Sequence, residues 1–352
     1  MNRLKSTLLI LLSILMVFSL VISGCGKKDE KVEETPNEDE NSVVVELPEP
    51  EFAYTAPLTG IGTNDPLPER LVAVMIENSA AARPQSGLQE ADVVYEILAE
   101  GMITRFIAIF HSQSPDTFGP VRSIRPYFIE LANGLDAIIV HAGSSIHAHF
   151  ILTKGDQPYL DETTNAGAYF TRVDFRQRPH NVYTNLERIW QGAKDKNYRL
   201  EGEFPKLQFL AEGEEVAGTP ANQVTITYSS SNYVVGYQYD ETSESYRRLV
   251  NGEAHVDKET NQPLTTKNLL VIEAPHQMIA NDEAGRREVE LDGPGQGYLF
   301  QQGKMQAITW ERTDKKMIRA FINGEEVKYI PGNTWVLVIP TVPGLAKSVV
   351  VE

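Results

Sequence analysis

Residues 88–112 read LQEADVVYEILAEGMITRFIAIFHS, and the way this stretch folds decides the architecture of the first half of the chain. Its first part can be read either as an amphipathic helix or as a strand that turns at Glu100 and Gly101 into a second strand. β-Branched and aromatic residues dominate both arms, and an acidic residue followed by glycine is typical of a hairpin turn. We therefore predict a β-hairpin over these residues.

The segments on either side of the hairpin predict further strands and a helix. Residues 71–78 (LVAVMIEN) are a short apolar run bounded by polar and turn-forming residues, which indicates a strand. Residues 135–141 (LDAIIVH) form a continuous apolar run of the kind found in buried strands. The loop AGSS follows and leads into a predicted short helix at 146–152, which Gly155 should end.

A second helix is predicted at residues 185–194. Thr184 stands three residues before Glu187, and this spacing matches a capping box at the start of a helix. Because strands and helices alternate up to this point, we predict an α/β domain over residues 55–215.

The pattern changes after the predicted α/β domain. From about Asn222 onward, short β-rich runs are separated by turns, and the pairs Asn251-Gly252, Gln302-Gly303 and Asn323-Gly324 occur at hairpin spacing. Residues 216–352 are therefore expected to form a mostly antiparallel, β-rich domain. The predicted fold class is α+β, with the α/β domain first.

The N-terminus predicts export and lipidation. Residues 1–24 have a basic start and a long apolar run, which is the pattern of a signal peptide, and Ile22, Ser23 and Gly24 resemble a lipobox before Cys25. Cys25 is the only cysteine, and we expect it to carry a diacylglycerol. Residues 25–54 are acidic and poor in apolar residues, so they are predicted to be a disordered tether. The chain should thus be anchored to the outer face of the cytoplasmic membrane.

The charge of the chain excludes some partners and draws attention to others. A formal net charge of −16 argues against binding to nucleic acid. Arginine is concentrated between Arg70 and Trp190, where nine arginines accompany one lysine, although lysine would serve solubility equally well. Arginine is preferred where a planar group must hold a carboxylate or phosphate at two points. These arginines either bind an anionic ligand or pair with carboxylates of the chain itself.

The stretch GPVRSIRPYFIELANG, residues 119–134, is where an anion site is easiest to place. Pro126 suits the first position of a helix and Gly134 suits its end. The free amide groups of such a helix point back towards Arg122 and Arg125, and the helix dipole adds positive potential there. An anionic ligand could be held by these groups, and so could a carboxylate of the chain, such as that of Glu96 or Glu100.

Candidate catalytic residues follow from the same region. His141 ends a predicted buried strand beside Ser144, and ligands of α/β sheets tend to bind at this edge. Together with Glu100 they are candidates for acid, base or nucleophile, although the sequence lacks a G-x-S-x-G elbow. His141, His147 and His149 match no zinc signature, so neither a metal nor a cofactor is predicted.

The loop at residues 171–184 (TRVDFRQRPHNVYT) precedes the second predicted helix and is rich in hydrogen-bonding groups. It is either a lip of the same anion site or a connection whose polar groups are satisfied within the protein. The complete set of predicted ligand contacts is Arg83, Arg105, Arg122, Arg125, Arg178, His180 and Asn181.

Five motifs follow one another behind the lipobox: LVAVMIENSAAARPQSGLQEADVVYE, EGMITRFIAIF, GPVRSIRPYF, HNVYTNLER and PGNTWVLVIP. Taken together and in this order, they resemble the YerB-like lipoproteins. The resemblance implies a two-part extracytoplasmic lipoprotein of bacteria with a Gram-positive type of envelope. It brings no known substrate and no established catalytic residues.

The leading prediction is a membrane-anchored binding or accessory protein of the cell envelope, with an arginine-lined cleft for an anion. The expected partners are proteins of cell-wall synthesis, in keeping with a link to peptidoglycan synthesis, or an anionic envelope polymer. A cell-wall or teichoic-acid hydrolase or transferase is the first alternative. A solute-binding lipoprotein of a transporter is the second, although that architecture normally needs two comparable α/β lobes.

Overall fold

The structure is a computed structural model that describes residues 51–228 and 233–352. The predicted signal peptide, the predicted lipidation at Cys25 and residues 25–50 of the predicted tether lie outside the described residues. No helix in the described part of the chain is both long enough and apolar enough to cross a membrane.

The hairpin predicted for residues 88–112 is confirmed. Its arms are β4 (Val93–Glu100) and β5 (Ile103–Phe110), which pair antiparallel, and Gly101 adopts φ +52° in the turn. The predicted strand at 71–78 is β3 (Val72–Glu77), and it pairs antiparallel with the other edge of β5. These three strands form part of the central sheet.

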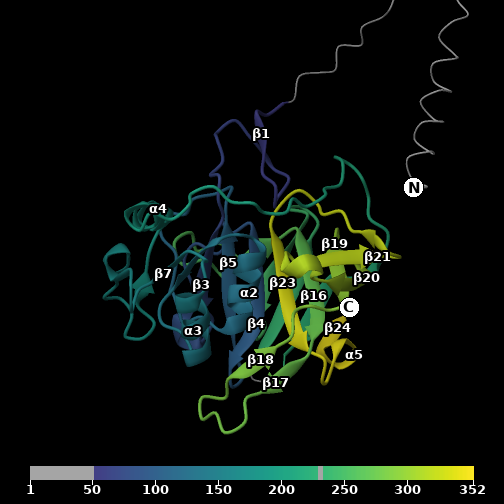
Figure 1. Cartoon of the computed structure of the whole chain (residues 1–352). Coiled ribbons are helices and arrows are strands. Elements are labelled where there is room, and N and C mark those ends of the chain that lie inside the picture. The colour runs from purple at the N-terminus through teal and green to yellow at the C-terminus, as the bar shows by residue number, and fades with distance from the viewer. Residues whose placement is uncertain (1–50, 229–232) are drawn as a thin grey trace, which may run out of the picture. The chain divides into compact units, whose positions relative to one another are not determined.

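The central sheet has 12 strands and draws on both halves of the chain (Figure 1). On one side, β6 and β7 continue from β3 by parallel pairing, and on the other side β23 pairs parallel with β4. Beyond β23 lies β16, again parallel, and the remaining strands are antiparallel. The bounds of these strands are β6 Ile138–His141, β7 Tyr159–Asp161, β10 Thr219–Pro220, β16 Asn268–Ala274, β19 Gly295–Gln301, β20 Lys304–Glu311, β21 Arg319–Ile322, β22 Glu325–Glu326 and β23 Thr334–Pro340.

A second, antiparallel sheet of six strands packs against the central one. Its strands are β11 Gln223–Thr227, β12 Val234–Asp240, β13 Ser245–Val250, β14 Glu253–Ala254, β15 Thr265–Thr266 and β24 Val349–Val351. All three predicted turn pairs have positive φ at both residues and join antiparallel strands, as a tight hairpin requires. The predicted α+β class, with a β-rich second half, is confirmed.

The remaining elements are short. Three two-stranded sheets are formed by β1 (Tyr54–Thr55) with β2 (Gly62–Thr63), by β8 (Thr171–Arg172) with β9 (Val182–Tyr183), and by β17 (His276–Met278) with β18 (Arg287–Val289). The helices are α2 Pro126–Gly134, α3 Ile146–Lys154, α4 Leu186–Asp195 and α5 Leu345–Ser348, with 3-10 turns η1 Ala80–Ala82, η2 Gly167–Tyr169 and η3 Thr313–Lys315.

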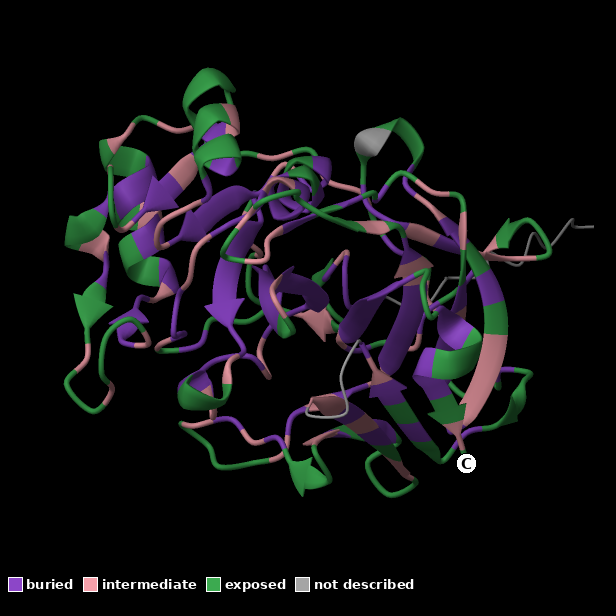
Figure 2. Ribbon diagram, turned by 90° about the horizontal axis from the view of Figure 1, so that it is seen from below, coloured by how far each residue is buried: buried purple, intermediate pink, exposed green. Residues whose placement is uncertain are grey.

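The central sheet is buried on both faces. Alternate residues of a strand point to opposite faces, and in β3 Val72, Val74 and Ile76 join the core shared with the second sheet. Ala73 and Met75 join the other core, to which α2 and α3 contribute. Both faces being covered explains why the sequence of β3 is apolar throughout rather than alternating. Figure 2 shows this buried centre and an exposed periphery.

The helix ends differ in one detail from the sequence prediction. Pro126 is the first residue of α2 and Gly134 is its last, as predicted, and Asp136 just beyond the helix adopts φ +47°. The helix predicted at 185–194 is α4, yet its N-cap is Asn185, whose side chain accepts a hydrogen bond from the Arg188 amide. The predicted capping by Thr184 is therefore wrong, because its hydroxyl donates to the Tyr169 carbonyl at 2.8 Å.

The predicted division between residues 215 and 216 remains a prediction about domain organisation. The described residues form one compact unit by their contacts, and strands from both sides of the division share the central sheet. Strands of each half therefore form backbone hydrogen bonds with strands of the other half, as β4 does with β23.

Candidate functional site

Two helices begin at the same pocket. α2 starts after Arg125, and α3 starts after Ser145, whose hydroxyl oxygen accepts a hydrogen bond from the Ala148 amide at 3.2 Å. The first turn of a helix has backbone N–H groups without helical partners and carries partial positive charge. The two starts contribute to one pocket of about 730 Å³.

The opposite wall of this pocket is the hairpin of β17 and β18 with its connecting loop. Figure 1 places this hairpin at the end of the described unit far from β1, where the chain enters it. We call the two sides the helix wall and the hairpin wall. The helix wall contains Arg125, Tyr127, Glu130, Ser145, Ile146 and Phe150, and the hairpin wall contains Gln277, Ile279, Arg286, Arg287, Glu288 and Glu290.

Two buried arginines meet one carboxylate beside the pocket. Arg125 forms an ion pair with Glu100 and donates to the Ile124 carbonyl at 2.6 Å. Arg105 lies 3.6 Å from the same carboxylate and donates to the Ser123 carbonyl at 2.7 Å. Of the two carboxylates considered from the sequence, Glu100 is thus the one that reaches the start of α2. It is a single negative charge between two guanidinium groups.

Arg287 is a third buried guanidinium at this place. It is 8% exposed, lines the pocket and donates to the Gly101 carbonyl. No carboxylate in the described part of the chain forms an ion pair with it, and within that part its Nε and that of Arg125 have no hydrogen-bond partner. Sequence reasoning missed Arg287, because it lies in a β-rich run outside the arginine-rich segment.

Burial lowers the pKa values of these three arginines. It lowers the pKa of Arg105 to about 10, and it also lowers the pKa values of Arg125 and Arg287. The guanidinium groups remain protonated at neutral pH, and a charged group in a poorly solvated place interacts strongly with an anion. Together, Arg105, Arg125, Arg287 and Glu100 carry a net charge of about +2.

A second charged cluster adjoins the first across the sheet. Glu77 is the register partner of Arg105, and its carboxylate lies 3.3 Å from Arg122 Nε and 2.8 Å from His180 Nδ1. The hydroxyl of Ser79 also donates to it at 2.9 Å. Arg122 is therefore joined to a carboxylate of the chain, and it does not line the pocket.

The other predicted ligand contacts are dispersed. Arg83 donates to the Asn78 carbonyl at 3.0 Å and lies over the ring of Tyr233. Arg178 is exposed, whereas Asn181 is buried and accepts a hydrogen bond from Arg172. Of the seven residues predicted, the structure brings only Arg125 into the wall of the pocket, with Arg105 beside it.

The candidate catalytic residues do not form a reactive constellation in the described chain. His141 has no exposed surface, its Nδ1 lies 2.9 Å from the Gly143 carbonyl, and Asp161 is 3.6 Å away. Burial lowers the pKa of His141, so its ring is neutral. Ser144 is half-buried, and the hydrogen bonds among the described residues include none between it and His141. Glu100 is held by its two arginines.

No group of three or more His, Cys, Asp or Glu residues in the described ranges is placed to hold a metal ion.

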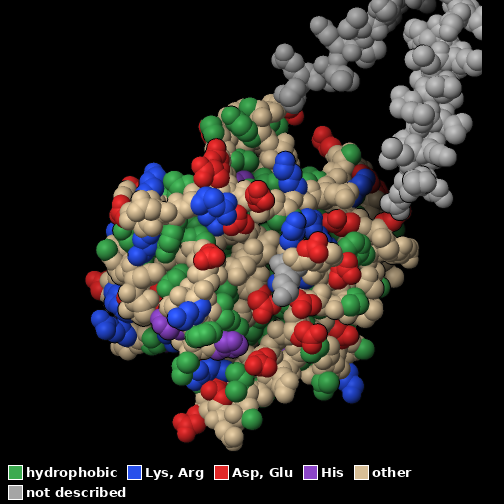
Figure 3. Space-filling model, in the orientation of Figure 1, with side chains coloured by type: hydrophobic (Ala, Val, Ile, Leu, Met, Phe, Trp, Pro, Cys, Tyr) green, Lys and Arg blue, Asp and Glu red, His purple; other side chains and the backbone are tan. Residues whose placement is uncertain are grey.

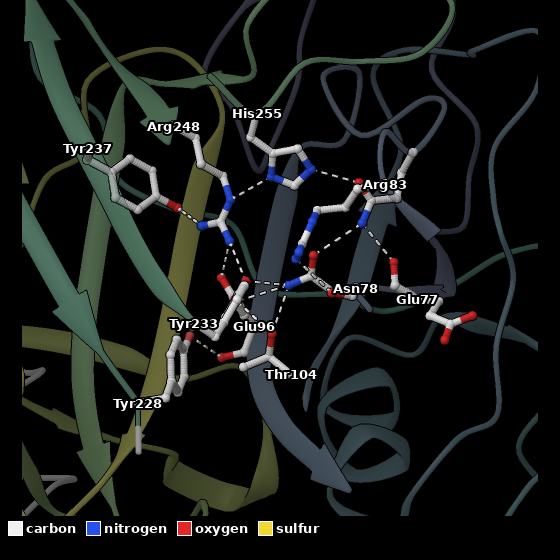
Figure 4. Close-up of polar contacts among 11 residues, drawn as sticks. Glu77, Asn78, Arg83, Glu96, Thr104, Tyr228, Tyr233, Tyr237, Arg248 and His255 are labelled. Atoms are coloured by element: carbon white, nitrogen blue, oxygen red, sulfur yellow. Dashed lines mark hydrogen bonds and ion pairs between the residues drawn. The ribbon is translucent and has the colours of Figure 1, made fainter. Parts of the chain in front are cut away.

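A buried polar network joins the two sheets (Figure 4). Arg248 of the second sheet lies 2.8 Å from Glu96 of β4, and the two side chains are 1% and 0% exposed. Arg248 also donates to Tyr237 and His255, and its guanidinium lies 4.8 Å from the ring centre of Trp335. The carboxylate accepts further hydrogen bonds from Asn78, Thr104 and Tyr233. Sequence reasoning missed this network, since Arg247 and Arg248 are adjacent and only the fold buries the second.

Comparison with known proteins places the chain in a family. Residues 58–199 match the N-terminal domain model, and residues 224–336 the C-terminal domain model, of the family described as "Protein of unknown function (DUF3048)". The chain is 39% identical over 305 residues to "Putative lipoprotein YerB" of Bacillus subtilis (strain 168), a match that covers 86% of this chain and 91% of that protein.

The fold is also that of a solved relative. The crystal structure of YerB from Bacillus subtilis superposes with a TM-score of 0.77 and 38% identity, covering 85% of this chain and 99% of the other. The resemblance seen in the sequence motifs is thereby confirmed. The chain belongs to the YerB-like DUF3048 family.

Proposed function

We propose that this chain is a lipid-anchored, extracytoplasmic binding or accessory protein of the cell envelope, and that it binds an anionic group in the pocket between α2, α3 and the β17–β18 hairpin. One observation carries the proposal: Arg287 is 92% buried in the pocket wall without a carboxylate partner in the described chain. Removing an isolated charge from water is costly, and buried charges are normally paired. A bound anion supplies the missing partner.

The surroundings of Arg287 support the same ligand chemistry. Two helix starts add partial positive charge at the pocket, and Glu100 neutralises only one of the two arginines that it contacts. The proposal replaces the set of contacts predicted from the sequence by a smaller one, in which Arg125, Arg286 and Arg287 reach the ligand. Arg122 and His180 instead hold Glu77.

The anchor is the second part of the proposal. Cys25 after the apolar segment carries it, and the name of the Bacillus subtilis relative supports it. Cys25→Ala should abolish labelling by a fatty-acid precursor and should move the protein from the membrane fraction to the soluble or precursor fraction. Unchanged labelling in this variant would contradict lipidation at Cys25.

The anion site is tested with the full-length protein in nanodiscs, using acetate and inorganic phosphate as probes. A ligand that binds only the folded state raises its stability in proportion to ln(1 + [L]/Kd), so both the melting temperature and the Arg side-chain NMR signals should respond. Arg287→Met should abolish the response, Arg287→Lys should keep part of it, and Arg247→Met, on the exposed face of β13, should have no effect. A wild-type protein that responds no more than Arg287→Met would overturn the proposal.

The alternatives are less well supported. An enzyme that uses His141 would need its buried ring to become accessible, and a solute-binding protein would need two lobes, whereas the pocket lies between two helices and a hairpin. Turnover of a wall or teichoic-acid substrate that is lost in His141→Ala would support the enzyme instead. Proteins of cell-wall synthesis, or an anionic envelope polymer, remain the partners that we propose.

A further inference from the structure

Both walls of the pocket carry charged groups of both signs. The helix wall carries the two helix starts and Arg125, as described above. On the hairpin wall, Glu288 and Glu290 are exposed, and no ion pair of either is found within the described residues. Buried and exposed residues alternate here, so that Arg287 is buried while Glu288, and Glu290 just beyond β18, are exposed.

The total charge of the lining decides between two kinds of anion. Three arginines and four carboxylates line the pocket, which gives a formal charge of −1. The carboxylates are Glu130, Asp282, Glu288 and Glu290, of which Asp282 pairs with Arg286 and Glu130 pairs with Arg312. A phosphate monoester with two negative charges would therefore bind beside two unneutralised carboxylates, and like charges at short range repel.

Apolar side chains stand between the charged groups. Ile146 and Phe150, one turn apart on α3, are 86% and 60% exposed, and Ile279 of the hairpin loop is 43% exposed. All three line the pocket. Exposed apolar side chains gathered at a pocket with a few charged groups are typical of a ligand site, and a volume of about 730 Å³ suits a ligand of a few residues rather than a folded partner.

From these three features we infer that the ligand is a short peptide with a free C-terminal carboxylate, an apolar middle and a nearby amino group. The inference rests on the proposed anion site and names its ligand class. The carboxylate binds at the helix starts with Arg125 and Arg287, the apolar part packs on Ile146 and Phe150, and the ammonium group faces Glu288 and Glu290. The carboxylate of the ligand then meets arginines from both walls, and its ammonium group meets the two carboxylates of the hairpin wall that form no ion pair within the described residues.

The test compares four small probes on the full-length protein in nanodiscs by isothermal titration calorimetry. The probes are the tripeptide Lys-Ala-Ala with free termini, its C-terminal amide, its form acetylated at both amino groups, and n-hexyl phosphate. We expect the free tripeptide to bind at least about tenfold more tightly than each of the other three, since one well-placed charged contact is worth about 1.4 kcal/mol or more.

Substitutions of the hairpin-wall carboxylates test which of them bind the ammonium group of the ligand. Glu288→Gln with Glu290→Gln should weaken the free tripeptide about tenfold and leave the acetylated form unchanged or tighter. Glu283→Gln, an exposed glutamate of the same hairpin loop outside the pocket lining, is the matched control and should change neither.

The outcomes separate the inference from the proposed function. If the acetylated tripeptide or hexyl phosphate binds as tightly as the free tripeptide, the zwitterionic ligand is wrong while the anion site stands. If the C-terminal amide binds as tightly as the free acid, or if none of the probes and neither acetate nor phosphate binds, the anion site itself is wrong.

Discussion

At the scale of single residues, Arg248 is a charged side chain that lies almost entirely inside the protein, where it is paired with Glu96. Burial by itself lowers its pKa, but the adjacent carboxylate of Glu96 and the surrounding tyrosines outweigh burial and raise it. The guanidinium is therefore charged at all ordinary pH values, and so it depends on its carboxylate partner. A buried ion pair adds little to the stability of the fold compared with apolar packing of the same volume. The loss of one partner is costly, however, because it leaves an isolated charge in the core.

Replacing Arg248 should accordingly destabilise the fold much more than replacing its neighbour. We expect Arg248→Met to cost about 3–5 kcal/mol in the free energy of unfolding, because Glu96 loses its counter-charge in a buried site. Arg247→Met is the matched control; Arg247 is 49% exposed and pairs with Asp240, so the cost should be below about 1 kcal/mol. Urea denaturation followed by tryptophan fluorescence measures both.

The double variant Glu96→Gln with Arg248→Met tests the reason for the effect. It should be more stable than Arg248→Met alone, because no uncompensated charge remains in the core. Equal losses for Arg248→Met and Arg247→Met would show that the pair does not matter for folding.

At the scale of single elements, a loop can require glycine because of a positive φ or because a side chain would clash. Gly87 and Gly324 have similar φ angles and separate these two reasons. Gly87 has φ +79° and Gly324 has φ +85°, a region that residues with a Cβ atom avoid. A Cβ atom on Gly87 would lie 2.7 Å from the Thr117 carbonyl oxygen and 2.9 Å from Phe118 Cβ, whereas nothing lies within 4 Å of one on Gly324.

Alanine substitutions should therefore have unequal costs. Gly324→Ala should cost about 1 kcal/mol, which is the penalty for the left-handed conformation alone. Gly87→Ala adds a clash with backbone atoms in a packed loop before β4, and we expect a further 1–3 kcal/mol or so. Thermal or urea unfolding of the two variants checks this, and equal stabilities would mean that the loop at Gly87 relaxes freely.

The β17–β18 hairpin should respond to pH through His276. Burial lowers the pKa of His276 to about 4, although the Ala274 carbonyl at 2.8 Å from its Nδ1 partly opposes the shift. Well above pH 6.5 the imidazole is neutral in both the folded and the unfolded chain. As the pH falls from 6.5 towards 4, the unfolded chain takes up the proton first, so the free energy of unfolding decreases by at most about 1.4 kcal/mol per pH unit.

His276→Gln should flatten this part of the stability profile, because glutamine does not titrate. Urea midpoints of the wild type and the variant between pH 7 and pH 4.5 provide the measurement. Parallel profiles, or an NMR titration of His276 with a midpoint near 6.5, would contradict the predicted depression of its pKa.

Sequence patterns predicted the local elements well and their long-range relations poorly. The hairpin of β4 and β5, the start of α2 at Pro126 and the turn at Asn323 and Gly324 each depend on neighbouring residues, so their signals are local. The pairing of β23 with β4 joins residues more than two hundred positions apart, and both strands read simply as apolar runs.

In the candidate site, too, the features that depend on neighbouring residues were predictable, and those that depend on long-range packing were not. Arg125 and the helix start were predictable, since both belong to one short motif. Arg287 was not, because nothing in the sequence of β18 indicates that its hairpin packs beside α2 and α3. The arginine bias pointed to the correct region, but most of those arginines contact groups of the protein itself, such as Glu77 and Glu100.

At the scale of the whole molecule, the central sheet makes the folding of residues 58–199 and of residues 224–336, the two regions that match the family's domain models, depend on each other. β23 lies between β4 and β16, so the strand that completes the first half comes from the last part of the chain. Trp335 on β23 packs edge-on against Phe106 on β5, and the Glu96–Arg248 pair adds a second connection. A fragment that ends near residue 215 would expose the edge of β4 and an apolar face.

We therefore expect residues 51–352 to unfold in one cooperative transition and fragments 51–215 and 216–352 not to fold separately. Calorimetry of the longer chain should give equal calorimetric and van't Hoff enthalpies, and NMR spectra of each fragment should lack the dispersion of a packed core. The two fragments mixed together should regain that dispersion, because each supplies the strands and the buried charge that the other lacks. Two separate transitions, or a well-dispersed spectrum from either fragment alone, would instead support two autonomous domains divided near residue 215.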